Sequence, residues 1–333
     1  MQAQPKLIDA FGRTVNYLRL SVTDRCDFRC IYCMAEEMTF MPRAQILTLE
    51  EIYQIAKAFS ELGVTKLRVT GGEPLIRRNI LELMHKLGGL HGVDELLMTT
   101  NGSHLDKMAQ GLHQAQVKRL NISLDTLNPE RFKRLTRTGD LQQVLRGIMS
   151  AKEQGFERIK LNAVILKNRN HDEVVDLVRY AVKHGFDISF IEEMPLGEVS
   201  EHSRAEAYYP SYQIREDLER HFSLSSVSDK TGGPSNYFKV DGNLVSRVGF
   251  ISPHSENFCS QCNRVRLTAE GRLLLCLGNE HSVDLKKIVR SNPGDRELLK
   301  QTIVEAMKIK PEKHEFNLQE KPVIFRHMSV TGG

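Results

Sequence analysis

Hydrophobic positions between residues 17 and 192 follow two alternating spacings. Short apolar runs rich in Val, Ile and Leu predict strands at 17–22, 64–70, 96–100, 117–124, 159–166 and 188–191. Between most of these runs, apolar residues recur every three or four positions, which is the spacing of an amphipathic helix. Strands that alternate with helices in this way are typical of a parallel sheet with helices packed outside it.

Capping residues indicate where several of the helices begin. Thr48, with a glutamate three residues later, predicts a capping box. Asn128 followed by Pro129 predicts a second helix start, because proline is tolerated in the first turn. We also expect Ser103 and Asn170 to cap the helices that follow them.

Polar motifs stand at the carboxyl end of strand after strand. They are Thr-Asp-Arg-Cys at 23–26, Gly-Gly-Glu-Pro at 71–74, Thr-Asn-Gly at 100–102, Ser-Leu-Asp at 123–125 and Glu-Glu-Met at 192–194. Barrel enzymes place their chemistry at that end of the strands. No Gly-x-Gly-x-x-Gly follows the first strand to indicate a dinucleotide-binding open sheet. Six units rather than eight predict an α/β fold with an incomplete (β/α)6 TIM-like barrel, open on one side.

The pattern changes after about residue 195. Residues 196–211 are polar with little periodicity, a short helix is expected at 214–222, and hairpins are expected at 237–248 and around the turn at 269–271. Two further helical segments and a polar tail ending in Gly332-Gly333 complete the chain. We expect residues 1–225 to form the partial barrel and residues 226–333 a smaller α+β domain that closes its open side.

Composition narrows the class of protein. The 333 residues carry 46 Lys and Arg against 42 Asp and Glu, a net charge of +4. This charge is too mild to indicate nucleic-acid binding, although it leaves room for a local anion pocket. No apolar run reaches the roughly 18–20 residues needed to cross a bilayer, and the first residues lack the apolar core of a secretory signal. We therefore expect a cytoplasmic protein with reduced thiols and neither a membrane nor a nucleic-acid partner.

Three of the six cysteines, Cys26, Cys30 and Cys33, lie in the loop after the first predicted strand. Thiols this close share a metal, form a disulfide or have no partner, and a disulfide is not expected in the cytosol. A structural zinc ion usually has four ligands, and the nearest histidine in the sequence is His85. An iron–sulfur cube fits better than zinc, because thiolates are its normal ligands. Three cysteines would leave the fourth iron open for a substrate.

The other three cysteines, Cys259, Cys262 and Cys276, form a second triplet near the end of the chain. Zinc is a stronger alternative here, since His254 and His281 are close enough in sequence to be a fourth ligand. Two arginines alternate just beyond Cys262, at positions 264 and 266, and at strand spacing they share one face. Two guanidinium groups beside a metal centre would make a good phosphate pocket.

The first triplet and a later motif resemble the radical S-adenosylmethionine (SAM) superfamily. Its signature is Cys-x3-Cys-x2-Cys with an aromatic residue, here Tyr32, before the last cysteine, and its second motif is similar to Gly-Gly-Glu-Pro at 71–74. The resemblance implies that the amino and carboxylate groups of SAM chelate the open iron, and that the second motif receives the methionine amino group. Glycines let the backbone come close to a ligand, and a backbone carbonyl or Glu73 can accept from an ammonium.

Longer stretches narrow the resemblance to one family, the GTP 3′,8-cyclases, also called molybdenum cofactor biosynthesis protein A. The matching stretches are 18–26, 68–75, 121–125 and 259–277, and the similarity runs over nearly the whole chain. The resemblance implies a lyase with two [4Fe-4S] clusters, SAM and GTP. In this family SAM yields a 5′-deoxyadenosyl radical that takes hydrogen from the GTP ribose. The ribose then attacks guanine C8, in the first step of molybdopterin biosynthesis.

The family's functional positions carry over where the motifs match. Cys26, Cys30 and Cys33 would hold the SAM cluster, and Cys259, Cys262 and Cys276 the second cluster, which binds the guanine end of GTP. The positions that contact SAM match Tyr32, Gly72, Thr99, Ser123 and Met194. The positions that contact GTP match Arg19, Lys66, Arg68, Lys160, Arg264 and Arg266. The implied catalytic set is Arg19 with the tail residues Gly332 and Gly333.

Two positions depart from the family pattern. Ser189 stands where other members have an arginine expected to contact the triphosphate, and Ala35 stands where a proline is usual. Loss of one guanidinium at a phosphate contact would cost about 1.5–3 kcal/mol of binding. Lys66 and Arg204 are candidates to compensate. Without compensation, the chain would be a weaker paralogue or act on an altered substrate.

The expected partners are GTP, the next enzyme of the molybdopterin pathway and an electron donor such as flavodoxin or ferredoxin, with a homodimer as a candidate assembly. Two other functions stay open at this point. One is a radical SAM enzyme that modifies peptides and has an auxiliary cluster, although such enzymes typically carry more cysteines in the C-terminal part. The other is a non-enzymatic, zinc-stabilised carrier with the Gly-Gly tail as a conjugation site.

Overall fold

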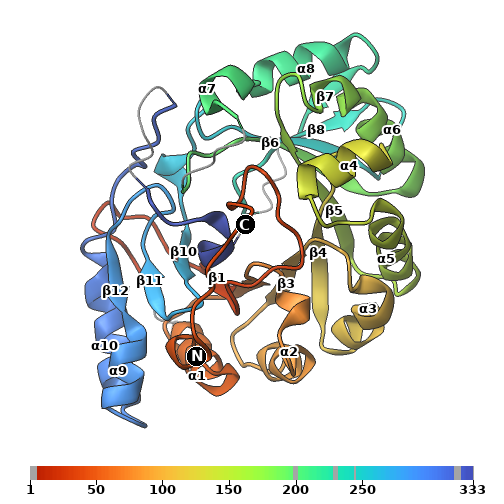
Figure 1. Ribbon diagram of the computed structural model, residues 1–333. Helices are drawn as coiled ribbons and strands as arrows, with labels where there is room; N and C mark the ends of the chain where they lie inside the picture. Colours follow the sequence, from red (N-terminus) through yellow and green to blue (C-terminus); the bar gives the residue numbers. More distant parts are fainter. Residues whose placement is uncertain (1–5, 198–201, 228–231, 244, 319–323, 333) are drawn as a thin grey trace.

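Six parallel strands form the centre of the computed structural model, which describes residues 6–197, 202–227, 232–243, 245–318 and 324–332. The strands are β1 (Tyr17–Ser21), β2 (Lys66–Thr70), β3 (Glu95–Thr100), β4 (Val117–Ser123), β5 (Arg158–Ile165) and β6 (Asp187–Glu192). Each pairs in parallel with the next one along the chain. Figure 1 shows them curving into a ring, so the predicted partial barrel is confirmed.

Helices connect these strands and cover the outside of the ring (Figure 1). They are α1 (Leu49–Glu61), α2 (Ile80–Gly88), α3 (Leu105–Gln114), α4 (Pro129–Thr136), α5 (Leu141–Glu153) and α6 (Val174–His184). Their apolar faces, with residues such as Phe59 and Leu83, share one hydrophobic core with the outward-facing strand residues Leu20 and Leu67. Because successive strand residues point to opposite sides, the alternate residues of each strand face the inside of the ring.

Two of the four predicted caps are confirmed. At the start of α1, Glu51 N donates to Thr48 Oγ1 at 3.2 Å and Thr48 N donates to the Glu51 carboxylate at 2.8 Å. At the start of α4, Asn128 Oδ1 accepts from Arg131 N at 2.9 Å. Both caps satisfy backbone donors that the first turn of a helix leaves unpaired.

The predictions for Ser103 and Asn170 are wrong. His104 precedes α3, and the Ser103 hydroxyl instead contacts Asp27 Oδ2 at 2.6 Å. Asn170 precedes a short 3-10 turn, and its side chain bonds Leu166 N and the carbonyl of Asp125. Both polar side chains are buried near strand ends, and there they satisfy loop groups instead of helix termini.

The C-terminal part of the chain extends both edges of the six-stranded core. On one side, β9 (Arg247–Ile251) pairs in parallel with β6, and β8 (Asn236–Val240) and β7 (Leu224–Ser226) follow it in antiparallel order. On the other side, β10 (Arg264–Leu267) pairs in parallel with β1, followed by β11 (Arg272–Leu274) and β12 (Ser282–Asp284). The predicted hairpins are confirmed, except that Leu244 lies outside the described residues. The boundary at residue 225 stays a prediction.

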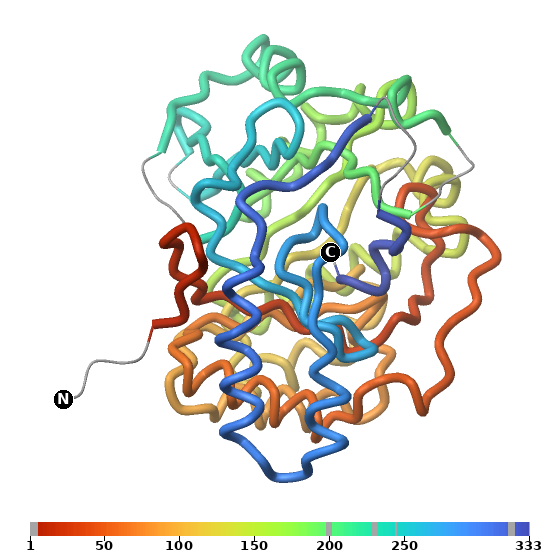
Figure 2. Tube along the Cα trace, turned by 90° about the vertical axis from the view of Figure 1, so that its left-hand side faces the viewer, coloured from red at the N-terminus to blue at the C-terminus, as the bar shows by residue number. Residues whose placement is uncertain are grey.

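The remaining helices are α7 (Arg204–Ala207), α8 (Ser211–Glu219), α9 (Leu285–Ser291), α10 (Arg296–Met307) and α11 (Met328–Thr331). Figure 2 shows the dark blue segment after α10 running along the length of the molecule. In Figure 1 the dark blue helix α11 lies inside the ring of strands. Within the described residues, no helix has the length and apolar character needed to cross a membrane.

Candidate active site

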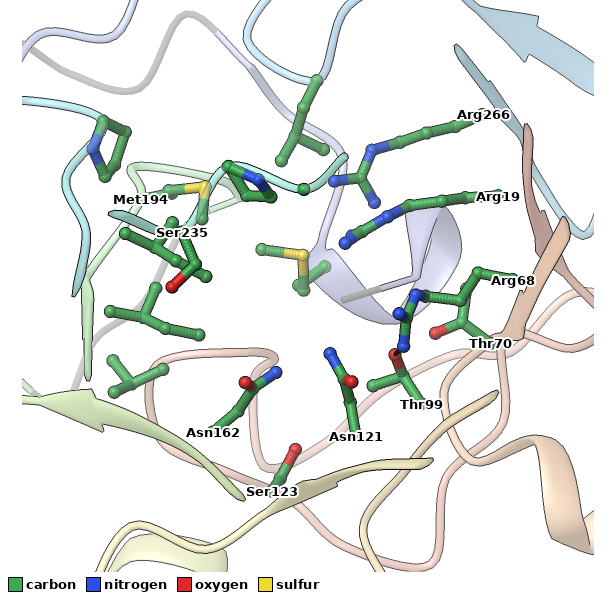
Figure 3. Close-up of a pocket in the computed structure, with 18 of the residues that line it drawn as sticks. Arg19, Arg68, Thr70, Thr99, Asn121, Ser123, Asn162, Met194, Ser235 and Arg266 are labelled. Carbon is green, nitrogen blue, oxygen red and sulfur yellow. Dashed lines mark hydrogen bonds between the residues drawn. The ribbon is translucent and has the colours of Figure 1, made fainter. Parts of the chain in front are cut away.

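A cavity inside the ring brings the sequence motifs together. Side chains from all six core strands line it, and so do all six cysteines. Every residue predicted to contact SAM or GTP also lines it: Arg19, Tyr32, Lys66, Arg68, Gly72, Thr99, Ser123, Lys160, Met194, Arg264 and Arg266. Figure 3 shows many of these side chains pointing inward from different strands. The motifs meet here because parallel strands present their carboxyl ends on the same side of a barrel.

The first cysteine triplet occupies the loop after β1. Cys26 Sγ accepts from Phe28 N at 3.4 Å and contacts Asn101 Nδ2 at 3.8 Å. Burial raises the pKa of the Cys33 thiol to about 12 and also raises the pKa values of Cys26 and Cys30. These thiols therefore stay protonated on their own, and metal binding would be coupled to release of their protons.

The second triplet flanks the β10–β11 pair: Cys259 and Cys262 precede β10, and Cys276 follows β11. Lys310, which is 2% exposed, places Nζ 3.6 Å from Cys262 Sγ and donates to the carbonyl of Leu275 at 3.0 Å. Burial opposes ionisation of Cys262, but the charges of Arg264 and Lys310 prevail and lower the pKa of this thiol. Lys310 could not be predicted from the sequence, because nothing near it in the sequence relates it to the cysteines.

Both triplets fit thiolate ligands of iron–sulfur cubes. All six cysteines are free of disulfides. Among the described residues, no three His, Cys, Asp or Glu side chains converge closely enough to hold one metal ion. The thiolates of a cube each bind a different iron, so they need not converge on one point. His254 contacts the carbonyl of Glu193 at 2.9 Å and His281 is exposed, so neither completes a zinc site in this arrangement.

Three adjacent strands form a wall of cations on one side of the cavity. In the register of the sheet, Arg19 of β1 lies between Arg68 of β2 and Arg266 of β10, as Figure 3 shows. Burial lowers the pKa of Arg19 to about 10, and the neighbouring guanidinium charges contribute. The Nε atoms of Arg19 and Arg264 are buried and find no hydrogen-bond partner in the part of the chain that the structure describes. Cations buried in this way need an anionic ligand.

Lysines complete the basic lining of the cavity. Lys66 of β2 pairs with Glu95 at 2.7 Å, and burial lowers its pKa to about 8. Lys160 of β5 lies across the cavity beside Tyr237, and burial lowers its pKa as well. Arg119 and Arg247, which the sequence analysis missed, also line the cavity. Both arginines lie on strands with side chains that face the cavity, and this strand position was the signal by which they could have been predicted.

The Gly-Gly-Glu-Pro motif packs directly against the first cysteine loop. Gly72 N donates to the carbonyl of Thr23 at 2.7 Å, and a Cβ on Gly72 would lie 2.2 Å from the carbonyl oxygen of Arg25. Glu73 is fully buried, and its carboxylate accepts from Leu75 N, Thr100 Oγ1 and Asn101 N. The Glu73 side chain therefore braces two strand ends. The backbone carbonyls of the motif are better placed than this carboxylate to receive a ligand's ammonium.

Other predicted SAM contacts have defined neighbours. The Tyr32 hydroxyl donates to Asp125 Oδ2 at 2.7 Å, which ties the cysteine loop to the end of β4. Thr99 Oγ1 accepts from Arg68 at 3.3 Å. Met194 and Ser123 point into the cavity from opposite sides (Figure 3).

The C-terminal tail enters the cavity. The Gly332 carbonyl accepts a hydrogen bond from Arg266 Nη1. The backbone of Gly332 has φ +74°, and a Cβ there would lie 2.2 Å from Thr70 Cγ2. Only glycine combines that conformation with so close an approach. Gly333 lies outside the described residues.

Ser189 faces a neighbour that fills the space of a longer side chain. It is fully buried, and its Oγ lies 2.9 Å from Ser235 Oγ. Of the two candidate substitutes for the missing arginine, Lys66 lines the cavity. Arg204 does not, because its guanidinium bonds Glu193 and the carbonyls of residues 196 and 197. The expectation for Arg204 is therefore wrong.

Comparison with known proteins agrees with this geometry. Family models match at residues 20–181, for the radical SAM superfamily, and at residues 186–316, for Molybdenum Cofactor Synthesis C. A GTP 3′,8-cyclase of Saccharophagus degradans is 58% identical over 327 residues, covering 98% of both chains. A GTP 3′,8-cyclase of Pseudomonas entomophila is 57% identical over 334 residues, covering 100% of both chains.

Solved structures resemble the fold. Streptococcus suis SuiB bound to S-adenosylmethionine has a TM-score of 0.61 and 14% identity, and the match covers 96% of this chain and 78% of SuiB. SuiB bound to its precursor peptide SuiA has a TM-score of 0.62 and 15% identity, with 92% and 76% covered. These identities are too low to show more than a shared fold. The full-length identity to the curated relatives decides the family: the chain belongs to the GTP 3′,8-cyclases of the radical SAM superfamily.

Proposed function

We propose that this chain converts GTP to 3′,8-cyclo-7,8-dihydro-GTP, the first step of molybdenum cofactor (molybdopterin) biosynthesis. The observation that carries this proposal is the meeting of both cysteine triplets and the basic wall at one cavity. The near-full-length likeness to GTP 3′,8-cyclases supports it. Nothing in the site favours the peptide-modifying enzyme or the zinc-stabilised carrier.

Cys26, Cys30 and Cys33 would hold one [4Fe-4S] cluster, and Cys259, Cys262 and Cys276 the other. The first cluster, when bound, supplies the electron that splits SAM into methionine and a 5′-deoxyadenosyl radical. Tyr32, Gly72, Thr99, Ser123 and Met194 would orient SAM beside it. The contacts of Gly72 with the cysteine loop support this role, because they bring the Gly-Gly backbone next to the cluster ligands.

The basic wall would bind the nucleotide. Arg19, Lys66, Arg68, Lys160, Arg264 and Arg266 place cations on both sides of the cavity, and a triphosphate would neutralise the buried guanidinium groups. The unpartnered Nε atoms of Arg19 and Arg264 support this assignment. Binding at this depth would hold the ribose and guanine in a fixed orientation and exclude water, which protects a radical from side reactions.

The tail would complete the site. Through its carbonyl, Gly332 holds Arg266 in place, and Arg19 is the adjacent cation on β1. We propose that Arg19, Gly332 and Gly333 act on the reacting nucleotide.

Several further assignments belong to the same proposal. They are a cytoplasmic location, an electron donor such as flavodoxin or ferredoxin, product transfer to the next enzyme of the pathway, and assembly as a homodimer. The structural division into a barrel part, 1–225, and a C-terminal part, 226–333, is supported by the positions of the second cysteine triplet and of β8 to β12 in the sequence, whereas β7 (Leu224–Ser226) spans the boundary.

Anaerobic purification and reaction test the proposal. The protein should be brown with about eight iron atoms per chain, since two cubes hold four each. Incubation with GTP, SAM and a reductant should yield the cyclised nucleotide, identified by mass spectrometry and NMR. Protein that carries both clusters and cleaves SAM, yet neither binds nor converts GTP, would contradict the proposal.

A further inference from the structure

A tyrosine occupies the middle of the basic wall. Tyr17 precedes Arg19 by two residues on β1, so both side chains face the cavity. In the register of the sheet, Tyr17 lies between Lys66 of β2 and Arg264 of β10. Its side chain is 2% exposed. A phenol is therefore enclosed by the cations that the proposed function assigns to the triphosphate.

The contacts of the phenol oxygen are with hydrogen-bond donors. Arg68 Nε donates to Tyr17 Oη, and the guanidinium of Arg19 lies over the ring, with Cζ 5.9 Å from its centroid. Lys66 Nζ lies 5.7 Å from the centroid of the ring. Among the described residues, these neighbours offer the hydroxyl hydrogen no acceptor. An oxygen that meets only donors is satisfied as a phenolate, or as a phenol once an acceptor arrives beside it.

The charges around Tyr17 also favour its ionised form. Burial alone would raise its pKa, but the charges of Arg68, Arg19 and Arg264 and the hydrogen bond from Arg68 lower the pKa to about 7. Farther round the cavity, Arg119 of β4, Lys160 of β5 and Arg266 of β10 are additional cations. Glu95 of β3 is a carboxylate neighbour, and it pairs with Lys66 and Arg119. The substrate-free wall therefore favours an ionised Tyr17 near neutral pH.

A bound nucleotide triphosphate would favour the protonated form of Tyr17 instead. Its oxygens accept hydrogen bonds from the guanidinium groups, and its negative charge disfavours a phenolate beside it. We propose that Tyr17 is a substrate-binding residue that takes up one proton from solvent as the nucleotide binds and then donates its O–H to a phosphate oxygen. This proposal rests on the proposed function, because it places the triphosphate against the basic wall. It predicts that nucleotide affinity falls as the pH rises, because the proton must be gained.

Proton uptake can be counted directly. GTP is titrated into anaerobic holoenzyme carrying both clusters, without SAM, in buffers of different ionisation enthalpy at about pH 8. The binding enthalpy then reports the protons exchanged. Wild-type protein should take up roughly half to one proton more per nucleotide than Tyr17→Phe. Tyr180→Phe, outside the cavity, should match the wild type. The Kd of the wild type should also rise more steeply with pH than that of Tyr17→Phe.

Lys66 and Lys160 are the other cavity groups that could gain a proton, because burial lowers the pKa of each. Removal of the phenolate would lower the pKa of both lysines further, so their uptake would rise in Tyr17→Phe instead of falling. If Tyr17→Phe loses its clusters, the double variant Lys66→Arg, Lys160→Arg decides, since arginine stays charged and the uptake that remains then belongs to Tyr17.

Equal proton counts in the wild type and Tyr17→Phe, with clusters intact, would overturn the proposal. No remaining uptake in the Lys66→Arg, Lys160→Arg double variant would overturn it too. Failure of the wild-type holoenzyme to bind GTP would instead contradict the proposed function.

Discussion

At the scale of single residues, the cavity contains two buried guanidinium groups, those of Arg68 and Arg266, that pair with no carboxylate among the described residues. Arg68 and Arg266 are each 7% exposed. Their polar contacts are with carbonyls, hydroxyls and a phenol, such as Met98 O for Arg68 and Gly332 O for Arg266. Such groups satisfy the N–H donors without neutralising the charge. A bound triphosphate would supply that missing negative charge.

Removal of one of these guanidinium groups should therefore weaken nucleotide binding. Arg266→Met is expected to cost about 1.5–3 kcal/mol, which corresponds to a roughly 10- to 150-fold higher Kd for GTP. Calorimetric titration of anaerobic holoenzyme measures the effect. Arg146→Met, at an exposed position on α5, is the control and should bind GTP as the wild type does. An unchanged Kd in Arg266→Met would remove this residue from the nucleotide site.

The surroundings of Ser189 could not be predicted from the residue at that position alone. The sequence showed that an arginine is absent there, but not what occupies its space. In the structure, Ser189 and Ser235 share a buried hydrogen bond, and β9 lies directly beside Ser189. Arg247, from that neighbouring strand, lines the same cavity. The cation count of the cavity thus depends on a strand pairing that is remote in sequence.

At the scale of elements, the short helix α11 and the tail after it carry a strong constraint. Gly332 combines φ +74° with a close approach to Thr70, the last residue of β2. An added side chain would have to push the tail away from the strand, because neither the backbone conformation nor the contact accommodates it. The tail position therefore depends on glycine at this residue.

Gly332→Ala should reduce the yield of cyclised nucleotide at least tenfold, a loss of about 1.4 kcal/mol or more of transition-state stabilisation. The same substitution should leave the iron content of the protein unchanged. The control is Gly294→Ala, since Gly294 also has a positive φ, +84°, but has no atom within 4 Å of an added Cβ. The Gly294→Ala variant should lose some stability and keep its activity. Equal activity of both variants in a turnover assay would show that the tail position is not needed.

Lys310 connects the segment after α10 to the second cysteine triplet. Its buried ammonium lies 3.6 Å from Cys262 Sγ. A positive charge at this distance from a thiolate ligand stabilises the reduced, more negative state of a cluster. Lys310 thus belongs to the environment that tunes the second cluster.

Lys310→Met should lower the reduction potential of the second cluster by on the order of 60 mV, equivalent to a tenfold change in a one-electron equilibrium. A redox titration followed by EPR spectroscopy measures it. Lys308→Met is the matched control, because Lys308 is exposed and pairs with Glu305 at the surface. An identical potential in Lys310→Met with full iron content would contradict the assignment.

The elements differ in how far the sequence predicted them. The six strands and their polar carboxyl ends could be predicted, since spacing of apolar residues and motif order are local properties. The failure of the caps at Ser103 and Asn170 could not be predicted. Their side chains instead form hydrogen bonds with Asp27 and Asp125, which come close only in the folded chain. The roles of Tyr17 and Lys310 could not be predicted for a similar reason, because they depend on the register of the sheet and on contacts between distant segments.

At the scale of the whole molecule, one continuous sheet joins both halves of the sequence. β9 covers the edge of β6, and β10 covers the edge of β1. The cavity draws one cysteine triplet and most of its lining strands from the first half, and the other triplet with β10 from the second. The C-terminal part is therefore a structural completion of the barrel as well as the carrier of the second triplet.

A fragment of residues 1–225 should fail to form a stable monomer. It would expose the unpaired edges of β1 and β6, which are templates for aggregation. Size-exclusion chromatography and binding of a hydrophobic dye should show aggregates for the fragment and a discrete species for the full chain. A discrete fragment that retains the first iron–sulfur cluster would show that the barrel part folds independently.

SAM and GTP are proposed to react together in this one cavity. The most direct test uses GTP deuterated at the ribose C3′, since the proposed reaction forms its new bond at that carbon. After anaerobic incubation with SAM and a reductant, mass spectrometry of the 5′-deoxyadenosine reports the origin of its new hydrogen. We expect deuterium in 5′-deoxyadenosine, together with a cyclised nucleotide that has lost it. Unlabelled 5′-deoxyadenosine, formed while GTP remains unchanged, would contradict a shared reaction of SAM and GTP.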